Sequence, residues 1–271
     1  MYTSLADLVA AVAILTVLAI ISIRLKLVDY TGTAAAFIVG FITLIFGGWN
    51  WFAVLLAFHL SAGLLTKYKY DIKRRLGVAE AKGGARAWTN VIGNGGIAAF
   101  FALAEGLFGG GAFFGGYLGA ISTAAADTLA TEIGLLYPGE PRLITNLKKK
   151  VPRGTSGGVS IYGELAILLA STIIGMVAII SGAEPSFSPI KILLIAVISG
   201  FVGSTIDSVL GATVQAQYWC ETCKKFTEVK HHRCGSEAKL VKGFECINNH
   251  VVNFTSTAIG GIIGFTLCLL L

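Results

Sequence analysis

Eight stretches of mostly apolar residues dominate this chain, and each is about as long as a helix must be to cross the ~30 Å hydrocarbon core of a bilayer. They fall at 4–23, 33–49, 50–66, 87–105, 112–136, 161–182, 190–213 and 251–271. Only 13% of the residues are charged, against ~25% in an ordinary soluble domain. We therefore predict one all-α integral membrane domain over residues 1–271, a polytopic bundle of about eight transmembrane helices.

Basic residues occupy alternate connections between these stretches. Twenty of the 21 Lys and Arg residues lie near 24–26 or within 67–86, 137–160 and 218–250, whereas 106–111 and 183–189 contain none. Because basic loops stay in the cytoplasm, we expect both termini outside and a multi-pass cell-membrane protein whose site faces the cytoplasm. The basic face could attract anionic lipids or a polyphosphate. Topology alone is the alternative explanation for these charges.

Two acidic residues interrupt apolar segments. Residues 124–132 read AAADTLATE and include Asp127, while 203–211 read GSTIDSVLG and include Asp207. A charge at the centre of a membrane costs ~2.5–3.5 kcal/mol on insertion scales, so such a residue indicates a functional site. Each Asp precedes a hydroxyl residue, Thr128 or Ser208, and we expect the two to form one site.

Carboxylate oxygens suit Mg²⁺, which takes one or two carboxylates together with substrate phosphates. Asp127, Asp207 and Glu132 are the candidate ligands. Glu132 lies about 140° from Asp127 around a regular helix. Asp127 with Asp207 is therefore the favoured pair.

A polar stripe begins the segment 87–105. Arg86, Asn90 and Asn94 are spaced four apart, which places their side chains on one helical face. The alternative to substrate binding is hydrogen bonding between helices, worth roughly 0.6 kcal/mol per contact. An arginine at this position favours an anion or a carboxylate as its partner. Gln215 extends the face of Asp207 in the same way.

A basic, glycine-rich connection follows the segment of Asp127. Lys148, Lys150 and Arg153 precede Gly154 to Gly158, and the segment 161–182 begins directly afterwards. Backbone N–H groups before a helix N-terminus can bind phosphate. The spacing is not that of a P-loop, and a plain turn is the alternative.

Residues 218–250 form a cysteine- and histidine-containing insertion before the last helix. A CxxC pair followed by further Cys and His residues is typical of a small structural zinc site. A basic cytoplasmic loop argues against disulfides, and free thiols or a redox pair are the alternatives. The predicted ligands are Cys220, Cys223, His232 and Cys234, with His231 or Cys246 as alternates.

Five motifs combine the residues described above: RxxxNVxxNG at 86–95, AADTxxxE at 125–132, PxGTxGGVS at 152–160, GSTIDSVLGAxxQ at 203–215 and NNxxxN at 248–253. Together they resemble the phytyl-phosphate kinase family, which comprises the plant vitamin E salvage enzyme and its archaeal, bacterial and animal membrane homologues. The chain departs from the family pattern at Ser156 and Asn249, where acids are frequent.

The resemblance implies a Mg²⁺-dependent phosphotransferase that moves a phosphoryl group from a nucleoside triphosphate, with CTP expected, to an isoprenyl monophosphate such as phytyl or geranylgeranyl phosphate. Asp127, Asp207 and Arg86 are the candidate catalytic residues, and Glu132 joins the two Asp residues around Mg²⁺. The candidates for the nucleotide phosphates are Lys148, Lys150, Arg153, Gly154, Thr155, Gly157 and Gly158. Those for the acceptor phosphate are Arg86, Asn90, Asn94, Ser208, Gln215, Asn249 and Asn253.

Three rival functions fit parts of the pattern. A secondary transporter could use Asp127 and Asp207 as ion sites. A lipid-phosphate nucleotidyltransferase or phosphatase would bind the same groups but cleave another bond, and a zinc-stabilised scaffold would leave both acids unexplained. Membrane lipids are expected partners and nucleic acid is not. A homodimer is left open.

Overall fold

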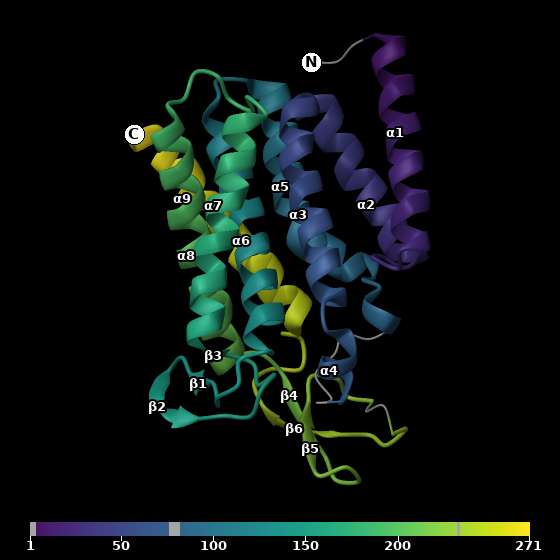
Figure 1. Ribbon diagram of the computed structural model, residues 1–271, viewed down its shortest axis with the longest axis vertical. Coiled ribbons are helices and arrows are strands. Elements are labelled where there is room, and N and C mark those ends of the chain that lie inside the picture. Colours follow the sequence, from purple (N-terminus) through teal and green to yellow (C-terminus); the bar gives the residue numbers. More distant parts are fainter. Residues whose placement is uncertain (1–3, 76–81, 232–233) are drawn as a thin grey trace.

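A computed structural model describes residues 4–75, 82–231 and 234–271. Eight long helices appear in these residues, which confirms the predicted bundle. Both termini lie at one end of it and all strands at the other (Figure 1). The helices are α1 (Leu5–Arg24), α2 (Tyr30–Ile42), α3 (Gly48–Lys67), α5 (Trp88–Phe108), α6 (Ala112–Gly134), α7 (Ile161–Ile180), α8 (Pro189–Thr213) and α9 (Asn249–Leu270).

Six segments of the described chain are long and apolar enough to span a membrane. The number is below eight for two reasons. Helices α2 and α3 are joined by the π-helical turn η1 (Thr43–Gly47) and run as one apolar segment of 38 residues. Helix α6 is less apolar because it contains the polar and glycine-rich positions of the site, and neighbouring helices surround it.

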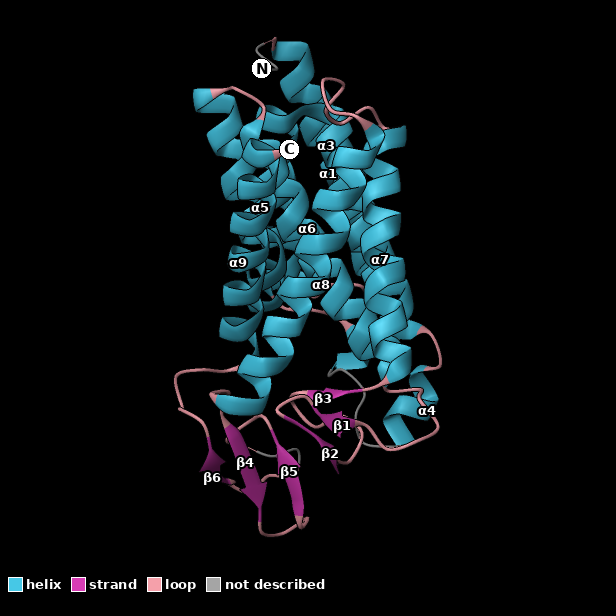
Figure 2. Ribbon diagram, turned by 90° about the vertical axis from the view of Figure 1, so that its left-hand side faces the viewer, coloured by secondary structure: helices cyan, strands magenta, loops and turns pink. Residues whose placement is uncertain are grey.

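Helix α6 lies at the centre of the bundle, between α5 and α9 on one side and α7 on the other (Figure 2). A side chain added at Gly115 would come within 2.5 Å of the carbonyl oxygen of Gly264 in α9. Gly119 is similarly close to the carbonyl of Gly260. Small residues thus let α6 and α9 pack backbone to backbone, as is common between membrane helices.

Two small antiparallel sheets lie at the end of the bundle opposite the termini (Figure 2). The sequence pattern did not predict them, because the strands are only two to five residues long and β2 is exposed throughout. One sheet has the order β2-β1-β3 and the other β5-β4-β6. Their strands are β1 (Arg142–Leu143), β2 (Asn146–Lys150), β3 (Gly158–Val159), β4 (Gln217–Cys220), β5 (Lys225–Thr227) and β6 (Lys239–Lys242).

A buried ion pair fixes the short helix α4 (Tyr70–Arg75) to this end of the bundle. The 3₁₀ turn η2 (Lys82–Gly84) lies between α4 and α5 in the chain. The side chain of Lys73 is 1% exposed, and its Nζ lies 2.6 Å from Oε2 of Glu132 in α6. Lys73 also donates to the carbonyl oxygen of Leu65 at 2.8 Å, and Thr66 Oγ1 donates to Glu132 Oε1 at 2.6 Å. Both carboxylate oxygens of Glu132 therefore have protein partners.

Replacement of Lys73 by Met should destabilise the protein by about 3–5 kcal/mol, because the Glu132 carboxylate would remain buried without its counter-charge. Thermal unfolding in detergent would show a lowered midpoint. The double variant Lys73→Met/Glu132→Gln should recover most of the loss, and Arg74→Met, an exposed change in the same helix, should have little effect. Equal stability of Lys73→Met and Arg74→Met would contradict the role of the ion pair.

Candidate functional site

The structure brings together the two acids that the sequence pairs. Asp127 of α6 and Asp207 of α8 lie within hydrogen-bonding reach of each other. Thr123, one turn before Asp127, donates through Oγ1 to the carbonyl of Ser199, about two turns before Asp207, at 2.9 Å and thereby fixes the register of the two helices. From α9, Ser256 Oγ donates to Asp207 Oδ2 at 2.8 Å. Asp207 is 9% exposed and Asp127 is partly exposed.

Two carboxyl groups this close cannot both be ionised without a positive charge between them or near them. Two asparagines of the neighbouring helices α5 and α9 also have buried amide oxygens, those of Asn94 and Asn253, and neither oxygen has a hydrogen-bond partner among the described residues. Asn253 belongs to the same turn of α9 as Ser256, whose hydroxyl also contacts the Asn253 carbonyl at 3.0 Å. Carboxylate and amide oxygens are the ligands that Mg²⁺ prefers, so the donor set fits that ion.

Glu132 is held elsewhere. Its carboxylate is engaged by Lys73 and Thr66, as described above, so a metal bound at Asp127 and Asp207 does not depend on it. Sequence reasoning missed both partners. Lys73 is one of seven basic residues in 67–86, and nothing in the local pattern distinguishes the buried one.

The polar stripe lies at the start of α5. The backbone of Arg86 donates to Leu27 O at 3.1 Å and accepts from Asp29 N at 3.0 Å, which holds it against the connection between α1 and α2. Its guanidinium donates to Thr66 Oγ1 at 3.1 Å, and its charge acts on Asp127. Asn94 Nδ2 donates to the carbonyl of Asn90 at 2.9 Å. The stripe thus connects the basic end of the bundle with the acid pair.

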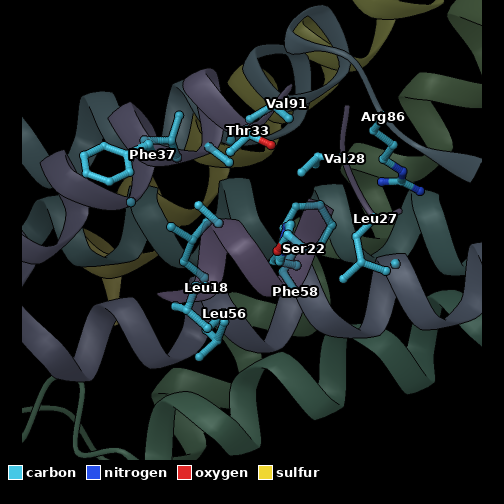
Figure 3. A pocket seen from close by; sticks show the side chains of 18 of the residues that line it. Leu18, Ser22, Leu27, Val28, Thr33, Phe37, Leu56, Phe58, Arg86 and Val91 are labelled. Carbon is cyan, nitrogen blue, oxygen red and sulfur yellow. The ribbon is translucent and has the colours of Figure 1, made fainter. Parts of the chain in front are cut away.

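A cavity that is partly open to the surroundings extends from this stripe between α1, α2, α3 and α5. Arg86 lies at one end of it in Figure 3, and Phe37 and Leu18 lie toward the other. The lining is apolar apart from a few groups, among them Ser22 and His59, which hydrogen-bond to each other at 3.0 Å. The sequence analysis did not predict this cavity, because a cavity between apolar helices leaves no motif.

The glycine connection lies one helical turn beyond Asp207. Gly154 and Gly157 have φ angles of +79° and +76°, which glycine adopts without strain. Gly157 lies directly against Ala212 of α8, where an added side chain would collide with the backbone. Ser160 accepts from Gly163 N at 3.2 Å and caps α7. The connection is therefore close to the acid pair, with the helix start directly after it.

The basic residues before these glycines are arranged differently. Lys148 and Lys150 project from the exposed strand β2, and Lys150 pairs with Glu140 at 3.0 Å. Arg153 donates to the carbonyl of Pro138 at 2.7 Å, and Thr155 Oγ1 donates to Pro152 O at 2.7 Å. All of them lie at the same end of the bundle as the glycines, on the outer side of the sheet or its connections.

The remaining acceptor candidates lie near the ends of α8 and α9. Ser208 follows Asp207 in α8, and Asn249 is the first residue of α9, after Asn248 caps it. Gln215 is 2% exposed, and its side-chain nitrogen has no partner among the described residues. Gly243, with φ +74°, packs on the Gln215 backbone and joins the second sheet to the end of α8.

Three of the predicted cysteine ligands come together. The sulfur atoms of Cys220, Cys223 and Cys234 all lie within 4.8 Å of one another, and those of Cys220 and Cys234 are 3.6 Å apart. Hydrogen bonding from Cys234, followed by burial and Cys220, raises the pKa of Cys223 to about 11. The three sulfurs could hold a metal ion. His232 lies outside the described residues, His231 pairs with Glu237 through the backbone, and Cys246 is exposed.

Relatives occur in plants and archaea. The chain is 33% identical to Protein PGR of Arabidopsis thaliana over 92% of both chains. It is 30% identical to an uncharacterized membrane protein of Methanocaldococcus jannaschii, over 96% of this chain and 94% of the relative. Protein VTE6, chloroplastic, of Arabidopsis thaliana is 30% identical over 86% of this chain and 63% of its own length. No solved structure matches.

All five sequence motifs lie within the part of the chain that matches a known protein family. Residues 13–261 match the integral membrane protein family DUF92, and this span includes the acid pair, the polar stripe, the glycine connection and the cysteine cluster. The relatives confirm the resemblance drawn from those motifs. The chain therefore belongs to the integral membrane protein family DUF92.

Proposed function

We propose that this protein is a membrane-embedded, Mg²⁺-dependent kinase that transfers the γ-phosphoryl group of a nucleoside triphosphate, CTP in the first instance, to an isoprenyl monophosphate. One observation carries the proposal: the Asp127–Asp207 pair lies between a glycine connection and an arginine-headed stripe that opens into an apolar cavity. The relationship to the phytyl-phosphate kinase family supports the same chemistry.

Arg86, Asn90 and Asn94 would bind the acceptor phosphate. An oxygen of that phosphate attacks the γ-phosphorus of the nucleotide, the bond from the γ-phosphorus to the bridging oxygen breaks, and the nucleoside diphosphate leaves. The attacking phosphate is already ionised at neutral pH, so no strong general base is needed. Catalysis then consists mainly of positioning and charge neutralisation. This accounts for a site that contains amides, an arginine and carboxylates.

The nucleotide phosphates would lie at Gly154, Thr155, Gly157 and Gly158, with Lys148, Lys150 and Arg153 as the surrounding positive charges. Asp127 and Asp207 would hold Mg²⁺, which when bound neutralises charge on the transferring phosphoryl group. Ser256 orients Asp207 by a hydrogen bond, so the carboxylate is positioned before substrate arrives. Ser208, Gln215, Asn249 and Asn253 complete the acceptor side of the proposal.

The site would face the cytoplasm, where nucleoside triphosphates are available. Both sheets, α4 and the predicted basic connections lie at the end of the bundle away from the termini (Figure 1). Basic connections favour retention in the cytoplasm. The proposal therefore places both termini outside.

A secondary transporter remains the second candidate, because paired acids between helices are common in ion pathways. The exposed sheets and the glycine connection are all at one end of the bundle, which favours the kinase. An alternating-access path would need polar groups toward both ends. A kinase would lose diphosphate formation when Asp127 or Asp207 is replaced, whereas a transporter would lose ion-driven uptake.

Asp127→Asn and Asp207→Asn should each lower diphosphate formation by about 10²–10³-fold, the loss typical when one group that stabilises developing charge is removed. The assay would use purified protein in detergent with Mg²⁺, labelled nucleotide and a panel of prenyl monophosphates. Asp71→Asn, an exposed change in α4, is the matched control and should retain activity.

Formation of no diphosphate with any donor and acceptor would show that the kinase proposal is wrong. Ion-driven uptake into proteoliposomes that Asp127→Asn and Asp207→Asn abolish would favour the transporter.

The cysteine cluster should hold one structural Zn²⁺ per chain, with Cys220, Cys223, Cys234 and His232 as the proposed ligands. Elemental analysis of the double variant Cys220→Ser/Cys223→Ser should show loss of the metal, and the melting temperature should fall because so small a sheet depends on its metal to fold. Cys268→Ser, in α9, should keep both. Full zinc content in the double variant would exclude these ligands.

A further inference from the structure

The cavity beside Arg86 is closed at its far end. Leu15 of α1, Gly40 of α2 and Phe52 of α3 each lie on the part of their helix that is distant from Arg86, and all three are buried. A side chain added at Gly40 would meet Leu15 Cδ2 at 2.8 Å and Phe52 Cε2 at 3.4 Å. These three residues therefore meet and form a floor.

The length of the cavity, from the Arg86 end to the floor, is set by the helices that line it. Seven residues of α1 separate Leu15 from Ser22, and ten residues of α3 separate Phe52 from Ala62, all four of which line the cavity. At 1.5 Å per residue this is roughly 10–15 Å. The cavity is thus long in one direction, polar at one end and closed at the other.

The outer wall of the cavity faces the membrane. Helix α1 lies at the edge of the bundle against α2 (Figure 1), and only 17% of its spanning segment is buried. One poorly buried helix, α1, therefore separates this side of the cavity from the surrounding lipid.

We propose that this cavity binds the single isoprenoid chain of a lipid monophosphate, with the phosphate at Arg86, and that the floor formed by Leu15, Gly40 and Phe52 limits the chain length. The proposal rests on the proposed function for the identity of the head group. Charge complementarity supports it, because the positive Arg86 lies at one end of the cavity and the floor at the other end is apolar.

The test compares binding of geranyl phosphate and of the longer geranylgeranyl phosphate, measured by native mass spectrometry without any nucleotide. Ala36 lines the cavity on α2, and Ala34 of the same helix is exposed. Ala36→Phe should weaken binding of geranylgeranyl phosphate by at least about tenfold, because the added ring occupies space that the chain would fill. Binding of geranyl phosphate should change by less than about threefold, and Ala34→Phe should alter neither.

A second variant tests the floor in the other direction. Leu15→Ala removes side-chain volume at the closed end, so it should improve binding of geranylgeranyl phosphate relative to geranyl phosphate. Equal effects of Ala36→Phe on both ligands, or a Leu15→Ala variant with unchanged preference, would overturn the proposal. Because binding is read without phosphoryl transfer, chain-selective binding in a protein that forms no diphosphate would refute the kinase and leave the cavity assignment intact.

Discussion

The contact between Asp127 and Asp207 is the constraint on which the rest of this structure depends. Two carboxyl groups inside a helix bundle repel each other once ionised, so their approach requires a counter-charge and polar neighbours. The neighbouring helices supply those neighbours: Ser256 from α9 contacts Asp207, and the charge of Arg86 before α5 acts on Asp127. Close approach of the two helices in turn requires small residues where they touch. Gly203 of α8 lies directly against Thr123 of α6, and only glycine leaves that space.

The bundle is divided between two tasks. Helices α5, α6, α8 and α9 bring together the acids, amides and hydroxyls, while α1, α2 and α3 surround an apolar cavity. Arg86 lies at the boundary, since its backbone is bonded to the α1–α2 connection and its side chain to Thr66 of α3. A lipid with an anionic head group and an apolar chain is divided in the same way, into a charged part for the polar site and an apolar part for the cavity. This correspondence links the polar site and the cavity in one proposal.

Much of the helical fold was predictable, because long apolar segments have few alternatives in a bilayer. The acid pair was also predictable, since a carboxylate is too costly in such a segment to occur without a purpose. The partner of Glu132 was not, because burial of Lys73 depends on where α4 docks and not on its own sequence. The cavity was hidden for a related reason: Leu15, Gly40 and Phe52 are ordinary apolar residues until three helices bring them together. The small sheets went unpredicted because their strands are only two to five residues long, and β2 is exposed throughout.

The central claim is that the acid pair binds a divalent cation together with nucleotide phosphates. The most direct measurement is anomalous diffraction from crystals grown with Mn²⁺ in place of Mg²⁺ and a non-hydrolysable CTP analogue. The account predicts a single anomalous peak within coordination distance of both Asp127 and Asp207, with the phosphates toward Gly154 to Gly158. A peak at Glu132, or phosphates bound with no metal at the two Asp residues, would contradict it.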